Sequence, residues 1–214
     1  MNEYYSTRIY LVRHAQAVSE DGSYGPNTQL SDLGRKQAYL VAEAFTNIKD
    51  INAIYTSPYP RAKETAELIG RKMKLTVSED IRLSEFQLGT SPKSQLGSKF
   101  YLSIWKPEHT GLEGGETVEQ FFNRVGIFCK EICNNHKNET IILVAHAGTI
   151  VGIYRWAMGI PTNSPWTFNI EVGNASISEF EMWPNGRVDK GPPNNAFLKR
   201  MGDCSHLATY HSNI

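Results

Sequence analysis

The stretch Ile9–His14, with the sequence IYLVRH, decides the fold expected for this chain. Its first four residues are apolar without interruption, which is typical of a strand covered on both faces in a parallel sheet. The run ends at Arg13 and His14, so two polar side chains follow directly on a buried strand. The stretch therefore predicts a sheet with helices on both faces and a polar site at the carboxyl end of this strand.

Two further stretches repeat this pattern along the chain. Residues 141–144 (IILV) form a second apolar run, and His146 follows it after one alanine. Residues 53–56 (AIYT) have strand length and lead through the sequence SPYP to Arg61, in the first turn of an expected helix. Because the carboxyl ends of parallel strands meet at one edge of a sheet, these side chains are expected to join the pair that follows the first strand.

Segments of helical periodicity alternate with the strands. They are expected at residues 32–45 with Ser31 as the N-cap, at 62–73, at 118–132 with a capping box from Thr117 and Gln120, and up to about Met158. This alternation predicts an α/β fold, a three-layer α/β/α sandwich with a mostly parallel central sheet. We expect one domain over residues 1–214, with a lid-like insertion at about 86–115, where glycines, prolines and lone aromatics interrupt any period.

The last part of the chain carries weaker signals. Runs typical of strands lie near Phe168–Val172 and Ser176–Trp183, and Pro184-Asn185-Gly186 is typical of a hairpin turn. The C-terminal tail has no predictable period.

Composition excludes several classes of function. The 214 residues include 22 Lys and Arg against 22 Asp and Glu, so no excess of positive charge is available for binding nucleic acid. No apolar run approaches the ~20 residues that cross a bilayer, and the first residues lack the features of a secretory signal. The sequence therefore predicts a cytoplasmic protein with no nucleic-acid or membrane partner.

The cysteines and the remaining histidines give no metal signature. Cys129 and Cys133 lie one helical turn apart and are interpreted as buried thiols. No His-Glu-x-x-His spacing, Walker-type loop or dinucleotide fingerprint is present. We expect no metal and no cofactor.

Arg13, His14, Arg61 and His146 form a cluster that favours anions. Guanidinium groups match phosphate oxygens, and first-turn amides of helices add aligned dipoles. An imidazole among such donors can attack phosphorus in line, so the cluster points to phosphoryl transfer through a phosphohistidine.

The chain also resembles a known family, the histidine phosphatase superfamily of phosphoglycerate mutase-like proteins. The matching segments, which span nearly the whole chain in the family's order, are LVRHA (11–15), LSDLGRKQA (30–38), SPYPRA (57–62) with Thr65 and Ala66, LSEF (83–86) followed by Gly89, GGET (114–117), VAHAG (144–148) and GDCSHL (202–207). The resemblance implies that His14 is the nucleophile and that Glu85 is the acid and base. It further implies that Arg13, Arg61 and His146 hold the phosphoryl oxygens. Glu116 is interpreted as a loop residue or a residue at a helix start, with contact to the phosphate pocket as the alternative.

Three positions depart from the family pattern. Ala15 stands at the usual glycine, Ala17 at the usual small hydroxyl residue and Glu20 at the usual asparagine. We hypothesise that the lost phosphate contacts are replaced from the loop after His14, by Gln16, Ser23 or Asn27.

The resemblance implies hydrolysis of a small phosphomonoester. Mutase-type transfer is the alternative, although the Arg-His-Tyr-Gly stretch of the cofactor-dependent mutases is absent and Phe86–Gly89 stands in its place. A third interpretation, prompted by the departures, is a non-catalytic module that binds phosphorylated ligands. Within the insertion, the aromatics either form an apolar wall for the substrate or pack on the core (Phe86, Phe100, Tyr101, Trp105). The lysines either bind a second anionic group of the substrate or face solvent (Lys93, Lys99, Lys106). The sequence leaves the substrate and the oligomeric state open, and a homodimer is compatible with it.

Overall fold

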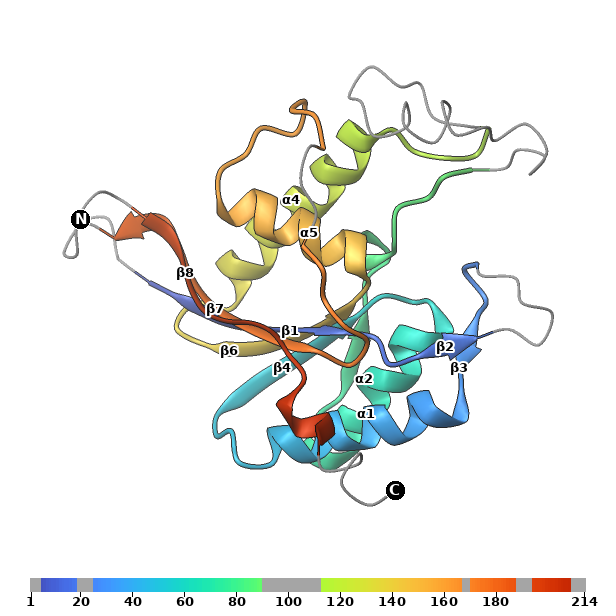
Figure 1. Cartoon of the computed structure of the whole chain (residues 1–214). Coiled ribbons are helices and arrows are strands. Elements are labelled where there is room, and N and C mark those ends of the chain that lie inside the picture. Colours follow the sequence, from blue (N-terminus) through green and yellow to red (C-terminus); the bar gives the residue numbers. More distant parts are fainter. Residues whose placement is uncertain (1–4, 19–24, 90–112, 167–169, 188–193, 209–214) are drawn as a thin grey trace.

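The computed structural model describes residues 5–18, 25–89, 113–166, 170–187 and 194–208. Within them a six-stranded sheet has the order β5-β4-β6-β1-β7-β8 (Figure 1). Strands β5, β4, β6 and β1 are parallel to one another, whereas β7 is antiparallel to β1 and β8, which confirms the mostly parallel sheet. The bounds are β1 (Thr7–Arg13), β4 (Ile51–Thr56), β5 (Val77–Glu79), β6 (Thr140–Ala145), β7 (Ile177–Arg187) and β8 (Asn194–Asp203).

Helices cover both faces of the sheet, as expected (Figure 1). α1 (Asp32–Phe45) and α2 (Pro60–Met73) lie on one face, and α4 (Val118–Asn135) and α5 (Ala147–Ala157) lie on the other. Side chains alternate along β1 accordingly: Ile9 and Leu11 pack with α4 and α5, and Tyr10 and Val12 pack with α1 and α2. Burial on both faces explains why this strand is apolar throughout.

The helix starts follow the local sequence signals. The Ser31 hydroxyl accepts from the backbone N–H of Gly34, and Thr117 and Gln120 form a reciprocal capping box. α2 begins with a proline at its first position, which leaves Arg61 in the first turn. These caps fix the directions in which α1, α2 and α4 leave the loops.

The predicted turn at Pro184–Gly186 is wrong. β7 continues to Arg187, and its pairing with β8 shifts register between Met182 and Arg187. Proline lacks a backbone N–H for the ladder, and the irregular pairing accommodates it. The expected strand near Phe168–Val172 is also absent from its described part, since residues 170–172 are irregular.

Several elements were not predicted from the sequence. They are the edge strands β5 and β8, the hairpin of β2 (Ala17–Val18) and β3 (Gln29–Leu30), and the 3-10 helix η1 (Ile81–Leu83). β5 is short, and both β5 and β8 are at sheet edges where one side is open. Neither therefore needs the continuous apolar run that marks β1 and β6.

The predicted insertion lies mostly outside the described residues, which stop at Gly89 and resume at Glu113. Gly89 has a φ of 85°, and a Cβ there would lie 2.7 Å from the backbone nitrogen of Gly115. The two ends of the intervening segment are therefore in direct contact. Phe86 packs edge-on against Phe121, and the other aromatics and the lysines named above lie outside the described residues.

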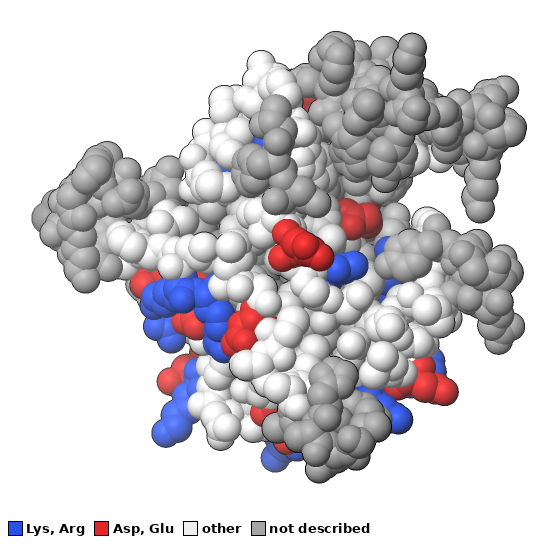
Figure 2. All heavy atoms as spheres, viewed as in Figure 1, with Lys and Arg blue, Asp and Glu red and all other residues white. Residues whose placement is uncertain are grey.

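The described surface mixes charges of both signs. Figure 2 shows Lys and Arg beside Asp and Glu on one face, and ion pairs of this kind join Lys199 to Glu181 and Arg200 to Asp203. Among the helices of the described ranges, none has the length and apolar character needed to span a membrane.

Candidate active site

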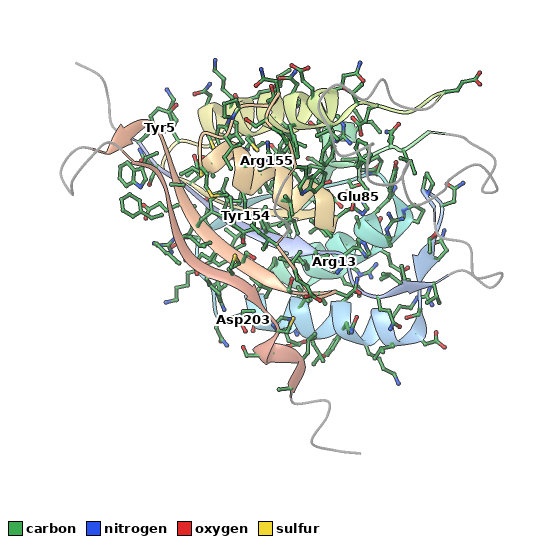
Figure 3. The ribbon with its side chains drawn as sticks, turned by 45° about the horizontal axis from the view of Figure 1, so that its top comes forward. Tyr5, Arg13, Glu85, Tyr154, Arg155 and Asp203 are labelled. Atoms are coloured by element: carbon green, nitrogen blue, oxygen red, sulfur yellow. The ribbon has the colours of Figure 1, made fainter. Side chains whose placement is uncertain are left out.

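The side chains predicted to converge lie at the carboxyl ends of three neighbouring strands. Arg13 is the last residue of β1 and His14 follows it, Arg61 lies in the first turn of α2 after β4, and His146 is the N-cap of α5 after β6. The ring centroids of His14 and His146 are 5.1 Å apart, and Nε of Arg61 donates to Nε2 of His14 over 3.2 Å. In Figure 3 Arg13 and Glu85 lie at this end of the sheet, whereas Tyr5 lies at the other end.

The imidazole of His14 is fixed in one orientation. Its Nδ1 lies 2.7 Å from the carbonyl oxygen of Ala15, which can only accept, so Nδ1 carries the proton of the neutral ring. Nε2 then presents its lone pair towards Arg61. Burial, followed by the Arg61 and Arg13 charges, lowers the pKa of His14 to about 3. The buried ring is thus neutral, and its Nε2 faces Arg61.

His146 is fully buried beside His14. Its Nε2 lies 2.8 Å from the hydroxyl of Ser57, the ring of Tyr59 packs edge-on against it at 5.1 Å, and its Nδ1 is buried with no partner among the described residues. Burial, followed by the charges of His14 and Arg61, lowers the pKa of His146 well below its ordinary value. A buried, unpartnered imidazole nitrogen is a free contact for an oxygen atom of a ligand.

The two arginines are held by backbone carbonyl groups. Arg13 Nη1 donates to the oxygen of Val172 at 2.6 Å, and Arg61 Nη1 donates to the oxygen of Gly25 at 2.8 Å. Nε of Arg13 is buried without a partner among the described residues. Two guanidinium groups and two helix N-termini thus face two neutral imidazoles, an arrangement that favours a phosphoryl dianion.

Glu85 reaches the site from the segment after η1. One carboxylate oxygen accepts from its neighbour, the backbone N–H of Phe86, at 2.9 Å, and the other accepts from the backbone N–H of Gly148 at 3.1 Å. Gly148 is the second residue of α5, two positions after the N-cap His146. A Cβ at Gly148 would collide with the carboxylate, so this glycine makes room for Glu85.

The residues hypothesised to replace the family's asparagine have other contacts. The side-chain oxygen of Gln16 accepts from the hydroxyl of Ser31 at 2.7 Å. Asn27 is exposed in a turn, where its carbonyl oxygen accepts from Gln29. Ser23 and Glu20 lie outside the described residues. A phosphate contact from Gln16 or Asn27 stays a prediction.

The sequence analysis missed several side chains that support the site. The Thr65 hydroxyl accepts from the backbone N–H of Ala15 at 3.2 Å, and Asn174 donates to the carbonyl oxygen of His14 at 3.1 Å. Ser57 and Thr65 lie inside segments already quoted for the resemblance, and this position could have identified them as residues that support the site. Asn174 comes from a loop with no periodic pattern and left no signal.

Glu116 lies just before the N-cap of α4, as expected, and makes a bidentate ion pair with Arg124. Within the described ranges, no three His, Cys, Asp or Glu side chains are grouped so that they could hold a metal ion.

Comparison with known proteins identifies the family of this chain. The family model of the histidine phosphatase superfamily (branch 1) matches residues 9–190. A putative phosphoserine phosphatase 2 of Hydrogenobacter thermophilus is 32% identical over 185 residues, covering 82% of this chain and 89% of that protein. Phosphoglycerate mutase-like protein 4 of Arabidopsis thaliana is 31% identical over 212 residues, covering 93% and 86%.

Solved structures show the same fold. The YhfR protein of Bacillus stearothermophilus superposes with a TM-score of 0.75 at 23% identity, covering 94% of this chain and 99% of that one. A mycobacterial glucosyl-3-phosphoglycerate phosphatase in complex with VO3 gives a TM-score of 0.70 at 26% identity, covering 90% and 97%. From its sequence, its fold and the site at the ends of β1, β4 and β6, the chain belongs to the histidine phosphatase superfamily (branch 1).

Proposed function

We propose that this protein is a metal-independent phosphomonoesterase that hydrolyses a small phosphorylated metabolite through a phosphohistidine at His14. The observation that supports this proposal is the fixed, neutral imidazole of His14, whose Nε2 lies 3.2 Å from Nε of Arg61. A neutral imidazole is itself a nucleophile, and the cationic donors beside it can hold the phosphoryl oxygens without a metal.

The first half-reaction forms the phosphoenzyme. Nε2 of His14 attacks phosphorus, the N–P bond forms, and the P–O bond to the leaving group breaks in line. Glu85 in its protonated form gives its proton to the departing alkoxide, so an alcohol leaves. Arg13, Arg61 and His146 stabilise the charge on the transferring phosphoryl oxygens.

The second half-reaction returns the enzyme to its starting state. The Glu85 carboxylate takes a proton from water as the water oxygen attacks phosphorus, and the N–P bond breaks. Inorganic phosphate leaves, and Glu85 is protonated again for the next ester. One carboxyl group serves both steps because its protonation state alternates.

Relatives support a small phosphomonoester as the substrate. Their names include phosphoserine phosphatase and glucosyl-3-phosphoglycerate phosphatase. We expect the lid-like insertion at about 86–115 to select among such esters, and Gln16 and Asn27 to contribute phosphate contacts once a ligand is bound. Unchanged phosphate inhibition after replacement of Gln16, Ser23 and Asn27 together would contradict the latter expectation.

The test is release of inorganic phosphate from a panel of phosphomonoesters with EDTA present. We expect wild-type turnover that is lost in His14→Ala, together with an acid-labile, alkali-stable phosphoryl group trapped on the wild-type protein. His136→Asn is the matched control, because His136 is the C-cap of α4 and its carbonyl oxygen accepts from Thr7 at the start of β1, the opposite end from the site. Phosphate release that survives in His14→Ala would overturn the assignment.

A further inference from the structure

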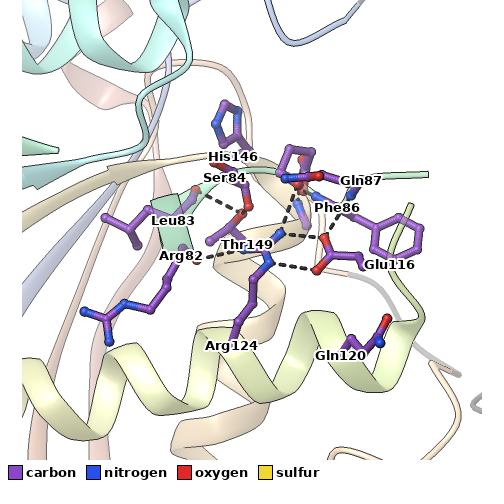
Figure 4. A network of polar contacts seen from close by, with 12 residues as sticks. Arg82, Leu83, Ser84, Phe86, Gln87, Glu116, Gln120, Arg124, His146 and Thr149 are labelled. Carbon is purple, nitrogen blue, oxygen red and sulfur yellow. Dashed lines mark hydrogen bonds and ion pairs between the residues drawn. The ribbon is translucent and has the colours of Figure 1, made fainter. Parts of the chain in front are cut away.

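Arg124 holds the segment that carries Glu85, although it lies on a different helix. From α4, its Nη1 donates to the carbonyl oxygen of Arg82 at 2.7 Å, and its Nη2 donates to the carbonyl oxygen of Glu85 itself at 3.1 Å. Figure 4 shows this guanidinium between the 82–87 segment and the start of α4. One side chain thus binds the backbone on both sides of Ser84.

Glu116 completes this arrangement. Its two oxygens accept from Nε and Nη2 of Arg124 at 2.8 and 2.7 Å, and Oε1 also accepts from the backbone N–H of Gln87 at 2.9 Å. The side chains are only 20% and 13% exposed, and the guanidinium lies 4.7 Å from the centroid of the Phe121 ring. A bidentate pair with little exposure has a fixed geometry, unlike a solvated surface pair.

α5, the other helix on this face of the sheet, holds the same segment. The Thr149 hydroxyl donates to the carbonyl oxygen of Ser84 at 2.9 Å, and the N–H of Gly148 donates to the Glu85 carboxylate. α5 therefore fixes the carboxylate end of Glu85, and Arg124 fixes its backbone.

We infer that Arg124 is a positioning residue for the acid step, placing the Glu85 carboxyl group for proton transfer to the leaving oxygen. This inference rests on the proposed function. Without the guanidinium, the carbonyl groups of Arg82 and Glu85 lose this donor, and Glu116 keeps a largely buried charge without its cation. A displacement of about 1 Å at a reacting group costs on the order of 100-fold in rate.

The acid step makes this role measurable through the leaving group. An alkyl phosphate releases a basic alkoxide that must be protonated as the P–O bond breaks, whereas 4-nitrophenyl phosphate releases a stable phenolate without protonation. kcat/KM reports only the steps up to formation of the phosphoenzyme, so it isolates the acid role of Glu85 from its base role.

The experiment compares kcat/KM for an alkyl phosphate and for 4-nitrophenyl phosphate in four variants. In Arg124→Ala we expect a loss of about 100-fold with the alkyl ester and of less than about threefold with the aryl ester. Glu85→Gln should show the same asymmetry, and Arg124→Lys should fall between wild type and Arg124→Ala. Glu131→Gln is the matched control on α4, because it breaks the exposed pair with Arg82 without touching residues 84–87.

The outcomes separate this inference from the proposed function. If Glu85→Gln is asymmetric and Arg124→Ala loses both activities equally or neither, Arg124 does not position the acid and the inference fails alone. If Glu85→Gln itself shows no asymmetry, Glu85 is not the acid and the proposed mechanism fails. Should Arg124→Ala not fold, as judged by thermal unfolding, the same ratio measured in Arg124→Lys decides.

Discussion

Nε of Arg61 lies 3.2 Å from Nε2 of His14, the nitrogen that we propose attacks phosphorus. The same arginine binds the carbonyl oxygen of Gly25 through Nη1, and its own carbonyl oxygen accepts from Thr65. The guanidinium is therefore fixed beside His14, where under the proposed mechanism it would also contact the phosphoryl oxygens during transfer. Loss of the Arg61 guanidinium should therefore slow the reaction.

Replacing Arg61 by methionine keeps much of the apolar stem and removes the charge. We expect kcat/KM to fall by about 100- to 1,000-fold, the usual loss when one fixed donor to a developing charge is removed. The matched control is Arg71→Met, an exposed arginine in the last turn of the same helix, α2. Steady-state kinetics with one phosphomonoester is the measurement, and equal losses in both variants would contradict the assigned role.

His14 makes the stability of the fold depend on pH. Its pKa is lowered to about 3 by burial and by the neighbouring arginines. Below about pH 6.5 the imidazole of the unfolded chain therefore binds a proton, whereas that of the folded protein stays neutral until about pH 3. The free energy of unfolding should therefore fall by roughly 2 kcal/mol between pH 7 and pH 4.5 through this group.

Urea unfolding at the two pH values tests that expectation in wild type and in His14→Gln. The variant should lose a smaller part of its stability on acidification, and the residual slope should include His146, whose pKa is also lowered. An unchanged pH dependence in His14→Gln would show that the ring is not held neutral in the folded protein.

Ser57→Ala removes the hydroxyl that lies 2.8 Å from Nε2 of His146. The same hydroxyl accepts from the backbone N–H of Tyr59. Leaving a buried ring nitrogen unpaired costs about 1–3 kcal/mol, so the melting temperature should fall and the imidazole should lose its orientation. We expect kcat/KM to fall about tenfold for each 1.4 kcal/mol lost in the transition state. Ser78→Ala on β5, which is exposed, is the control and should change neither quantity.

Gly148→Ala places a methyl group against the Glu85 carboxylate at the start of α5. The carboxylate must move and lose its bond to the Gly148 N–H, so hydrolysis of alkyl phosphates should fall more than that of 4-nitrophenyl phosphate. Gly126→Ala is the control, because its added Cβ meets only the Trp156 side chain, at 3.2 Å. A variant at Gly148 with wild-type rates on alkyl esters would show that the observed carboxylate position is not the one used in catalysis.

The sequence by itself determined the layers and the ends of the strands. The uninterrupted run at Ile9–Val12 can be buried only between two layers of helices, and polar residues directly after such runs must gather at the carboxyl edge of a parallel sheet. His14, Arg61 and His146 are therefore brought together by local pattern and strand direction alone.

The tertiary structure decided what holds these side chains. Ser57 and Gly148 are far in the sequence from the residues they contact, and only the packed fold shows that they fix His146 and Glu85. The pairing of Arg124 with the Glu85 segment depends on how α4 lies across η1, which no periodicity encodes. Hydrogen bonds between segments distant in the sequence form only once the hydrophobic layers have set the distances, so the orientation of the site had to come from the fold.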